Sequence, residues 1–305
     1  MKQQYKGRLT HGAKTTVALV AAIMAAGAAS AAEFDLTAPG NQQVNVLGDV
    51  GGTAIFADHF TQPAGTGVFE PFLTLDANGQ TSTGNNRIES AYNTDGFTAL
   101  YLDQLRPQWN ERLTLGDLAQ ITLNNVNYYA FILDANEPGN NKSLISIDNI
   151  RIYTSATDNT AAVGNNIANL NSLGALRWAM NDPLSTGTTP PDVNGFNVDT
   201  WVKLDAAQEN VGAGSNQANG GSGMSDMIVY VPVTAFAGAL LTDYVWFYNL
   251  NGVHYNSDTG TGATSGYEEW RAVVDLNRVP EGGSTAIMLG LALLGFGGLR
   301  RKLQK

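Results

Sequence analysis

Apolar and aromatic residues recur along this chain in short segments that are separated by polar turn clusters. The segments are rich in β-branched and aromatic residues and have the lengths of strands. Turn-forming sequences such as ANGQ, EPGNN, VNGF and NLNG lie between them. The pattern predicts strands at residues 53–60, 69–76, 96–103, 119–134, 143–155, 176–180, 200–205, 226–233, 243–255 and 267–275.

One segment, residues 143–155, shows a two-residue alternation over its whole length. In a regular strand, successive side chains point to opposite faces of the sheet. The alternation predicts one face made of Leu144, Ser146, Asp148, Ile150 and Ile152. The opposite face would then carry Ile145, Ile147, Asn149, Arg151 and Tyr153.

Helical spacing is confined to residues 161–176, where Gly164 and Asn165 weaken it. About ten strands with short turns predict an all-β fold, a β-sandwich or jelly-roll-like core. We place this secreted β-rich domain at residues 32–278. Two arrangements stay open: a division into two subdomains near 155–171, or one jelly roll with a long insertion.

The N-terminus has the pattern of a secretory signal peptide at residues 1–31. Lys2, Lys6, Arg8 and Lys14 precede an apolar stretch at 15–29, and small residues follow it. This order of basic, apolar and small residues predicts a signal helix that is cleaved after Ala31 or Ala32. An uncleaved N-terminal anchor is the alternative.

The C-terminus has three parts: the sequence VPEGG, an uncharged apolar run, and a basic end. The run at 284–299 holds 16 residues and would span about 24 Å as a helix, against about 30 Å for a hydrocarbon core. Local thinning of the bilayer and snorkelling of the flanking basic residues make up the difference. We therefore predict a transmembrane helix at 284–299, with Arg300, Arg301 and Lys302 as its cytoplasmic anchor.

This tail, residues 279–305, resembles the PEP-CTERM class of exosortase sorting signals, in a Val-Pro-Glu-Gly-Gly variant. The common form has a second proline where this chain has Gly282. The sorting motif would consist of Val279, Pro280, Glu281, Gly282 and Gly283.

The resemblance implies a particular route through the cell. It implies export in a Gram-negative-type cell, transient anchoring in the inner membrane, and removal of the tail by an exosortase-type processing enzyme, a membrane-embedded cysteine transpeptidase. The protein would then reach the cell surface or the extracellular space. Proteins with such tails are associated with extracellular polysaccharide and biofilm. A permanent C-terminal anchor is the simpler alternative.

Charge and composition narrow the function of the core. The chain has 17 Lys and Arg against 27 Asp and Glu, but eight of the basic residues lie in the two ends. The segment 33–280 keeps nine basic and 26 acidic residues, a net charge near −17, which repels nucleic acid and favours solubility. There is no cysteine, and only His59 and His254 lie between the ends, so thiolate and multi-histidine metal sites are excluded.

Asp and Asn concentrate in turn-like sequences, which suggests Ca²⁺ as the one candidate cofactor. Ca²⁺ takes six to eight oxygen ligands from carboxylates, amides and carbonyls. The candidate ligands are Asp134, Asn136, Glu137 and Asp148. Ordinary turn chemistry explains the same residues without a metal.

The run YVWFYNLNGVHY holds the densest group of aromatic residues. On a strand, Tyr244, Trp246 and Tyr248 share one face and could stack on sugar rings. Packing in the core is the commoner role of such rings.

No catalytic set is assigned. A glycosidase needs two carboxylates facing each other, and Glu268 and Glu269 are neighbours that point to opposite faces of a strand. We therefore predict a non-enzymatic surface or matrix protein with a structural or adhesive role. The alternatives are a carbohydrate-binding module, with or without Ca²⁺, and a glycan-active enzyme that uses Glu268 or Glu269.

Overall fold

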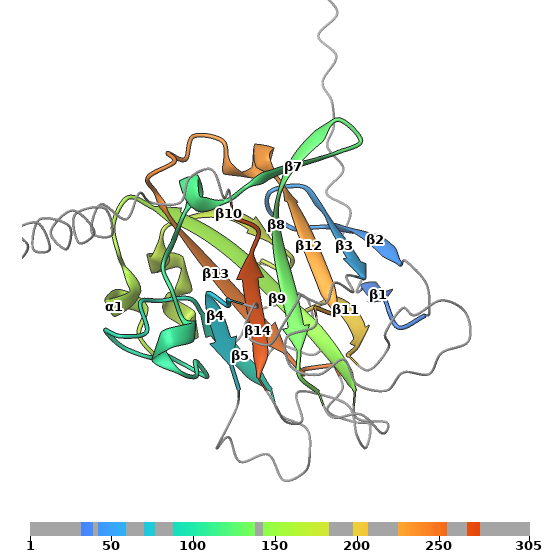
Figure 1. The fold of residues 1–305 in the computed structure, drawn as a ribbon, viewed down its shortest axis with the longest axis horizontal. Coiled ribbons are helices and arrows are strands. Elements are labelled where there is room, and N and C mark those ends of the chain that lie inside the picture. The colour runs from blue at the N-terminus through green and yellow to red at the C-terminus, as the bar shows by residue number, and fades with distance from the viewer. Residues whose placement is uncertain are drawn as a thin grey trace, which may run out of the picture.

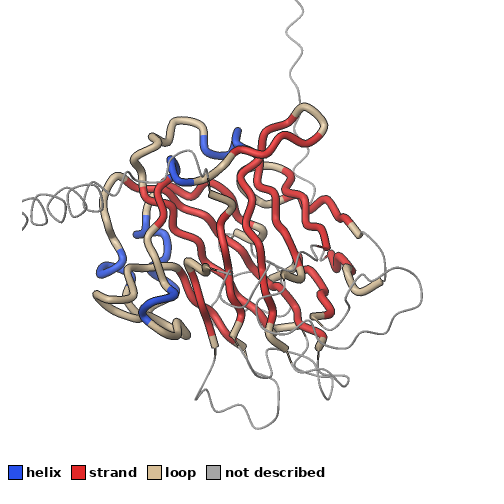
Figure 2. The backbone as a smooth tube through the Cα atoms, viewed as in Figure 1, coloured by secondary structure: helices blue, strands red, loops and turns tan. Residues whose placement is uncertain are grey.

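The computed structural model describes residues 32–38, 42–58, 70–76, 88–137, 143–182, 198–206, 225–254 and 267–274. These residues are mostly β-structure and form two sheets of seven strands each (Figures 1 and 2). The predicted β-rich fold is confirmed, and the two-sheet arrangement is that of a sandwich.

The first sheet runs in the order β1-β11-β9-β13-β5, with β10 beside β9 and β6 beside β13. Its pairs are antiparallel except for β1 and β11, which are parallel. The strands are β1 (Ala32–Asp35), β11 (Thr200–Asp205), β9 (Leu144–Ser155), β13 (Tyr244–Asn251), β5 (Glu89–Tyr92), β10 (Ala175–Ala179) and β6 (Leu113–Thr114).

The second sheet is antiparallel and runs in the order β2-β3-β12-β8-β14-β4, with β7 beside β8. The strands are β2 (Gln43–Leu47), β3 (Thr53–Asp58), β12 (Met227–Pro232), β8 (Val126–Ala135), β14 (Glu268–Ala272), β4 (Leu73–Leu75) and β7 (Gln120–Leu123). Asn124 and Asn125 join β7 to β8 with φ values of 48° and 64°, the conformation that a two-residue hairpin turn requires.

The main core fills the space between the sheets and consists of aliphatic and aromatic side chains from both. Phe131 of β8 and Phe247 of β13 meet there with ring centroids 5.0 Å apart, and Trp270 of β14 lies 4.7 Å from Phe247. Burial of this apolar surface supplies the main drive for the two sheets to pack.

A smaller apolar cluster covers the outer face of the first sheet. Short helical segments, α1 (Thr160–Val163) and the 3₁₀ helix η3 (Ile167–Leu173), pack there against Tyr153, Trp246 and Tyr248. The weak helical spacing at 161–176 therefore corresponds to real helical turns. The remaining 3₁₀ turns are η1 (Pro107–Trp109), η2 (Leu115–Asp117) and η4 (Val233–Phe236).

Most predicted strands are present, with three kinds of error. Residues 119–134 were predicted as one strand but form the hairpin of β7 and β8. Residues 96–103 were predicted as a strand but form turns and irregular structure, in which Leu102 has a positive φ of 57°. The sequence also gave no signal for β1, β2, β5 and β6, which are two to five residues long and depend on pairing with longer neighbours.

The predicted face alternation of β9 is wrong beyond Ile147. The register against β13 shifts by one residue, because Leu250 pairs with Asn149 while Asn251 pairs with Ile147. This β-bulge leaves Asp148 without a cross-strand partner in β13 and reverses the faces beyond it. The main core therefore receives Ile145, Ile147, Ile150 and Ile152 from one strand.

Both predicted targeting segments, residues 1–31 and 279–305, lie outside the described residues. Within the part of the chain that the structure describes, no helix is long and apolar enough to cross a membrane.

Candidate functional site

Two glutamates from opposite sheets meet inside the sandwich. Glu89 begins β5 in the first sheet and Glu268 begins β14 in the second, and their side chains share a hydrogen bond. Both residues are only 1% exposed. Strand alternation explains the direction of each side chain, since Ala91 and Trp270, two residues further along, also belong to the main core.

Asn251, at the end of β13, completes this carboxyl pair. It lies beside Glu89 in the sheet register, and its Nδ2 donates a hydrogen bond of 2.8 Å to Glu89 Oε1. Two buried oxygens nearby, Asn251 Oδ1 and Glu268 Oε1, have no hydrogen-bond partner. A buried acceptor left without a donor lowers stability by about 1–3 kcal/mol, so the pair is an energetically unfavourable feature of the fold.

The charges that act most strongly on the pair are those of carboxylates. Burial raises the pKa of Glu89 to about 7, against the effect of its bonds to Glu268 and Asn251. Burial, and then the charges of Glu89 and Glu137, hold the pKa of Glu268 well above its ordinary value. Asp76 acts on both members and Asp103 acts on Glu89. Burial and the nearby carboxylates therefore disfavour the state in which both glutamates are charged.

Glu269 lies on the opposite face of β14 from Glu268. It pairs in register with Asp134 of β8 and Thr74 of β4, and burial raises its pKa to about 7. The two neighbours thus point to opposite faces, as strand geometry predicts. Glycosidase carboxyls stand about 5–9.5 Å apart around a sugar, whereas Glu268 and Glu89 are in direct contact.

A second polar group lies at the bulge of β9. The carboxylate of Asp148, which is fully buried, accepts hydrogen bonds from Ser146 Oγ (2.8 Å) and the backbone N–H of Val253 (2.6 Å). Its Oδ1 lies 2.6 Å from Nδ1 of His254, whose ring stacks on Trp201 at 4.5 Å between centroids. Burial raises the pKa of Asp148 against the opposing effect of His254.

This arrangement fixes the imidazole but differs from a catalytic triad. The hydroxyl of Ser146 donates to the carboxylate, and its oxygen accepts from the backbone N–H of His254 at 3.3 Å. A nucleophilic serine would instead bond the far nitrogen of the histidine. The contacts of Asp148 therefore join β9 to the chain that follows β13.

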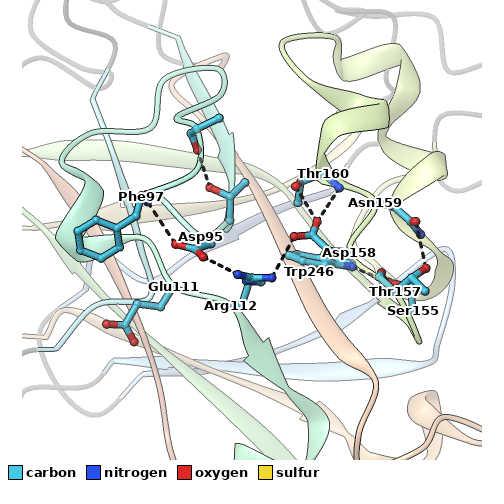
Figure 3. A network of polar contacts seen from close by, with 12 residues as sticks. Asp95, Phe97, Glu111, Arg112, Ser155, Thr157, Asp158, Asn159, Thr160 and Trp246 are labelled. Carbon is cyan, nitrogen blue, oxygen red and sulfur yellow. Dashed lines mark hydrogen bonds and ion pairs between the residues drawn. The ribbon is translucent and has the colours of Figure 1, made fainter.

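A third polar network is exposed and joins two loops (Figure 3). Arg112 bonds Asp95 on one side and Asp158 on the other, the latter at 3.3 Å, and its guanidinium lies 5.9 Å from the ring centre of Tyr244. Asp158 in turn accepts hydrogen bonds from the backbone N–H of Thr160 at 3.0 Å and from Thr160 Oγ1 at 2.7 Å, at the start of α1. The side chain of Arg112 is 35% exposed, so the network is partly solvated.

The candidate Ca²⁺ ligands are divided between different surroundings. Asp134 stands beside Glu269, Asn136 Nδ2 donates to the Tyr267 carbonyl at 2.8 Å, and Glu137 acts on Glu268. Asp148 belongs to the other sheet and contacts His254. Among the described residues, no group of three or more His, Cys, Asp and Glu side chains stands ready to hold a metal ion.

The candidate sugar-stacking residues lie mainly inside the protein. Trp246 and Tyr248 are fully buried in the outer cluster of the first sheet. Tyr244 keeps partial exposure beneath Arg112. Trp246 also donates from Nε1 to Ser155 Oγ at 2.8 Å, which satisfies its polar edge. These two buried rings offer no surface to a ligand.

Sequence reasoning missed Glu89, Asn251 and the pairing of Asp148 with His254. Glu89 lies in a four-residue strand with no alternation long enough to be recognised. His254 and Asp148 are 106 positions apart, and only the pairing of β13 with β9 brings them together. The turn-forming sequence NLNG at the end of β13 contains Asn251, but it indicates a turn and not a contact with Glu89.

Comparison with known proteins finds a match at the C-terminus. Residues 278–303 match the VPDSG-CTERM motif. Against the letters of that name, Val279, Pro280 and Gly283 agree, while Glu281 and Gly282 replace Asp and Ser. The match supports a PEP-CTERM-like sorting signal and indicates an exported protein. No curated protein and no solved structure matches the chain.

Proposed function

We propose that this chain is a structural or adhesive protein of the cell surface or extracellular matrix, delivered by an exosortase-type system. The observation that carries the proposal is the sorting motif at 278–303. A signal-peptide pattern at the other end agrees with it, because export of the N-terminus leaves the basic C-terminus in the cytoplasm.

The proposed route has two membrane stages. Residues 1–31 direct export, and residues 284–299 then hold the protein in the inner membrane with Arg300, Arg301 and Lys302 on the cytoplasmic side. Cleavage near the motif by the processing enzyme releases the β-sandwich. The acidic core, near −17 in net charge, suits a soluble exported domain.

The proposed role of the sandwich is structural or adhesive. In support, Trp246 and Tyr248 pack into the core, and the facing pair Glu89 and Glu268 is closed to a sugar ring by direct contact. Association with extracellular polysaccharide is the proposed setting for this role.

The experiment that tests delivery compares three forms of the full chain in an exosortase-bearing cell. These are the wild type, a form with Pro280→Ala and Glu281→Ala, and a control with Glu70→Ala, which changes an exposed acidic residue far from both targeting segments in sequence. Mass spectrometry of the C-terminus and fractionation follow each form. We expect a shortened wild type and control at the surface or in the medium, and an uncleaved motif variant in the inner membrane.

Identical processing and location of all three forms would contradict sorting by this motif. A wild type that stays in the membrane with an intact tail would support a permanent anchor instead.

A deletion strain tests the matrix role. Support for this role would be a strain that no longer retains polysaccharide at the cell surface, and in which the wild type restores retention but the motif variant does not.

A further inference from the structure

We propose that Glu89, Glu268 and Asn251 form a binding site for one Ca²⁺ ion between the two sheets. The three side chains come from the ends of three strands, β5, β14 and β13. All are at least 99% buried. This group differs from the candidate ligands that the sequence suggested.

The oxygens that lack partners point to a cation. Asn251 donates from Nδ2 to Glu89, which leaves Oδ1 as the end of its amide without a partner. Glu268 Oε1 is likewise buried and has no hydrogen-bond partner. Two buried acceptors thus remain beside the same pair of carboxyls.

The local charge favours a cation over a neutral ligand. Asp76, Asp103 and Glu137 add their negative charges to those of the glutamates. The charges that act most strongly on the pair are all those of carboxylates. A divalent cation between the carboxyls would convert this repulsion into attraction.

The ligand set matches Ca²⁺ in chemistry. Ca²⁺ accepts carboxylates in one- or two-oxygen contact together with amide carbonyl oxygens, whereas Mg²⁺ keeps several waters and demands octahedral geometry. Two glutamates and one asparagine supply up to five oxygens.

Binding would join the two sheets at this end of the sandwich. Glu89 and Asn251 are neighbours in the first sheet, and Glu268 belongs to the second. An ion held by all three would therefore oppose separation of the sheets and raise the unfolding temperature by mass action.

The experiment uses the full-length protein and three variants, Glu268→Gln, Glu89→Gln and Glu269→Gln. Each is unfolded thermally in chelator and in increasing CaCl₂, and Ca²⁺ binding is measured by calorimetry. Glu269→Gln is the matched control, because it removes the neighbouring carboxyl on the opposite face of the same strand. Glu268→Gln and Glu89→Gln remove a buried charge, so we expect both to fold in chelator.

We expect the wild type and Glu269→Gln to bind one Ca²⁺ with an unfolding midpoint that rises with CaCl₂. Glu268→Gln and Glu89→Gln should bind at least tenfold more weakly. The proposal is overturned if the wild type binds no Ca²⁺, or if Glu268→Gln and Glu89→Gln bind as tightly as the wild type. An unfolding midpoint of the wild type that changes with pH but not with CaCl₂ would also overturn the proposal, because protons alone would then satisfy the two carboxyls.

Discussion

Replacing Trp270 by Phe tests the polar contact that joins the sheets next to the carboxyl pair. Trp270 is fully buried on β14, and its Nε1 donates a hydrogen bond of 2.9 Å to Asn249 Oδ1 on β13. The substitution leaves a buried amide oxygen without a donor, which destabilises by about 1–3 kcal/mol. It also leaves a void beside Phe247, whose ring centre lies 4.7 Å away.

We expect Trp270→Phe to lower the free energy of unfolding by about 3 kcal/mol. For a domain of this size, each kcal/mol corresponds to about 2–4 °C, so the midpoint should fall by about 6–12 °C. Thermal and urea unfolding measure both quantities. The contribution of the hydrogen bond is separated from that of the void by a double-mutant cycle with Asn249→Leu.

The cycle gives a sharp criterion. If the hydrogen bond stabilises the fold, the double variant should lose at least 1 kcal/mol less than the sum of the two single variants, because neither partner is left unpaired. Losses that add to within about 0.5 kcal/mol would refute the reasoning and assign the whole effect of Trp270→Phe to packing.

Three further predictions concern the backbone, the arginines and the buried carboxylate. Gly51→Ala should lower the free energy of unfolding, measured in urea, by more than about 2 kcal/mol, because its φ is +86° and a Cβ would lie 2.3 Å from the Arg177 carbonyl oxygen. Gly52 has a similar φ of +85° but open space around it, so Gly52→Ala should lower the free energy of unfolding by only about 1 kcal/mol. Equal losses would contradict this. Arg112 is partly exposed, so Arg112→Met should change the free energy of unfolding by less than about 1 kcal/mol. Arg151→Met removes buried hydrogen bonds to Tyr153 and Asn181 and should lower the free energy of unfolding by about 3 kcal/mol. Similar losses for the two variants would refute the role of burial. His254→Leu should lose about 2 kcal/mol at pH 7, because it leaves buried Asp148 without its ring partner. In the wild type His254 opposes the rise that burial causes in the pKa of Asp148. Without His254 that pKa rises further, so the folded variant binds a proton more readily than the folded wild type, and its deficit should shrink as the pH falls from 7 to 5. A deficit that grows over this range would contradict that assignment.

Much of the fold could be predicted because its signals are local. Long strands such as β8 and β9 carry ten and twelve residues of β-favouring sequence, and this composition identifies them without knowledge of their partners. The Asn-Asn turn between β7 and β8 was less specific, since the sequence 119–134 was predicted as one strand and is in fact a hairpin. The short strands β2, β5 and β6 were not predictable, because pairing rather than local composition maintains them.

The site residues show the same difference between local signals, which could be predicted, and contacts between distant strands, which could not. Strand alternation sufficed to predict that Glu268 and Glu269 point to opposite faces, and the structure places one inward and the other beside Asp134. The identity of the opposing carboxyl, Glu89, could not be predicted, because it lies 179 positions away in a strand of the other sheet. No local pattern encodes contact between such distant residues.

The sequence by itself determined the strand-rich class of the fold, the acidic core and the sorting motif at 278–303, because composition, charge and a contiguous motif are properties of the chain in order. The tertiary structure alone decided which side chains meet. One bulge at Asp148 turns Ile150 and Ile152 to the main core and brings Asp148 to His254. Packing of the two sheets then sets Glu268 against Glu89. Both outcomes depend on register and on contacts between distant strands, which the order of residues within any one segment does not specify.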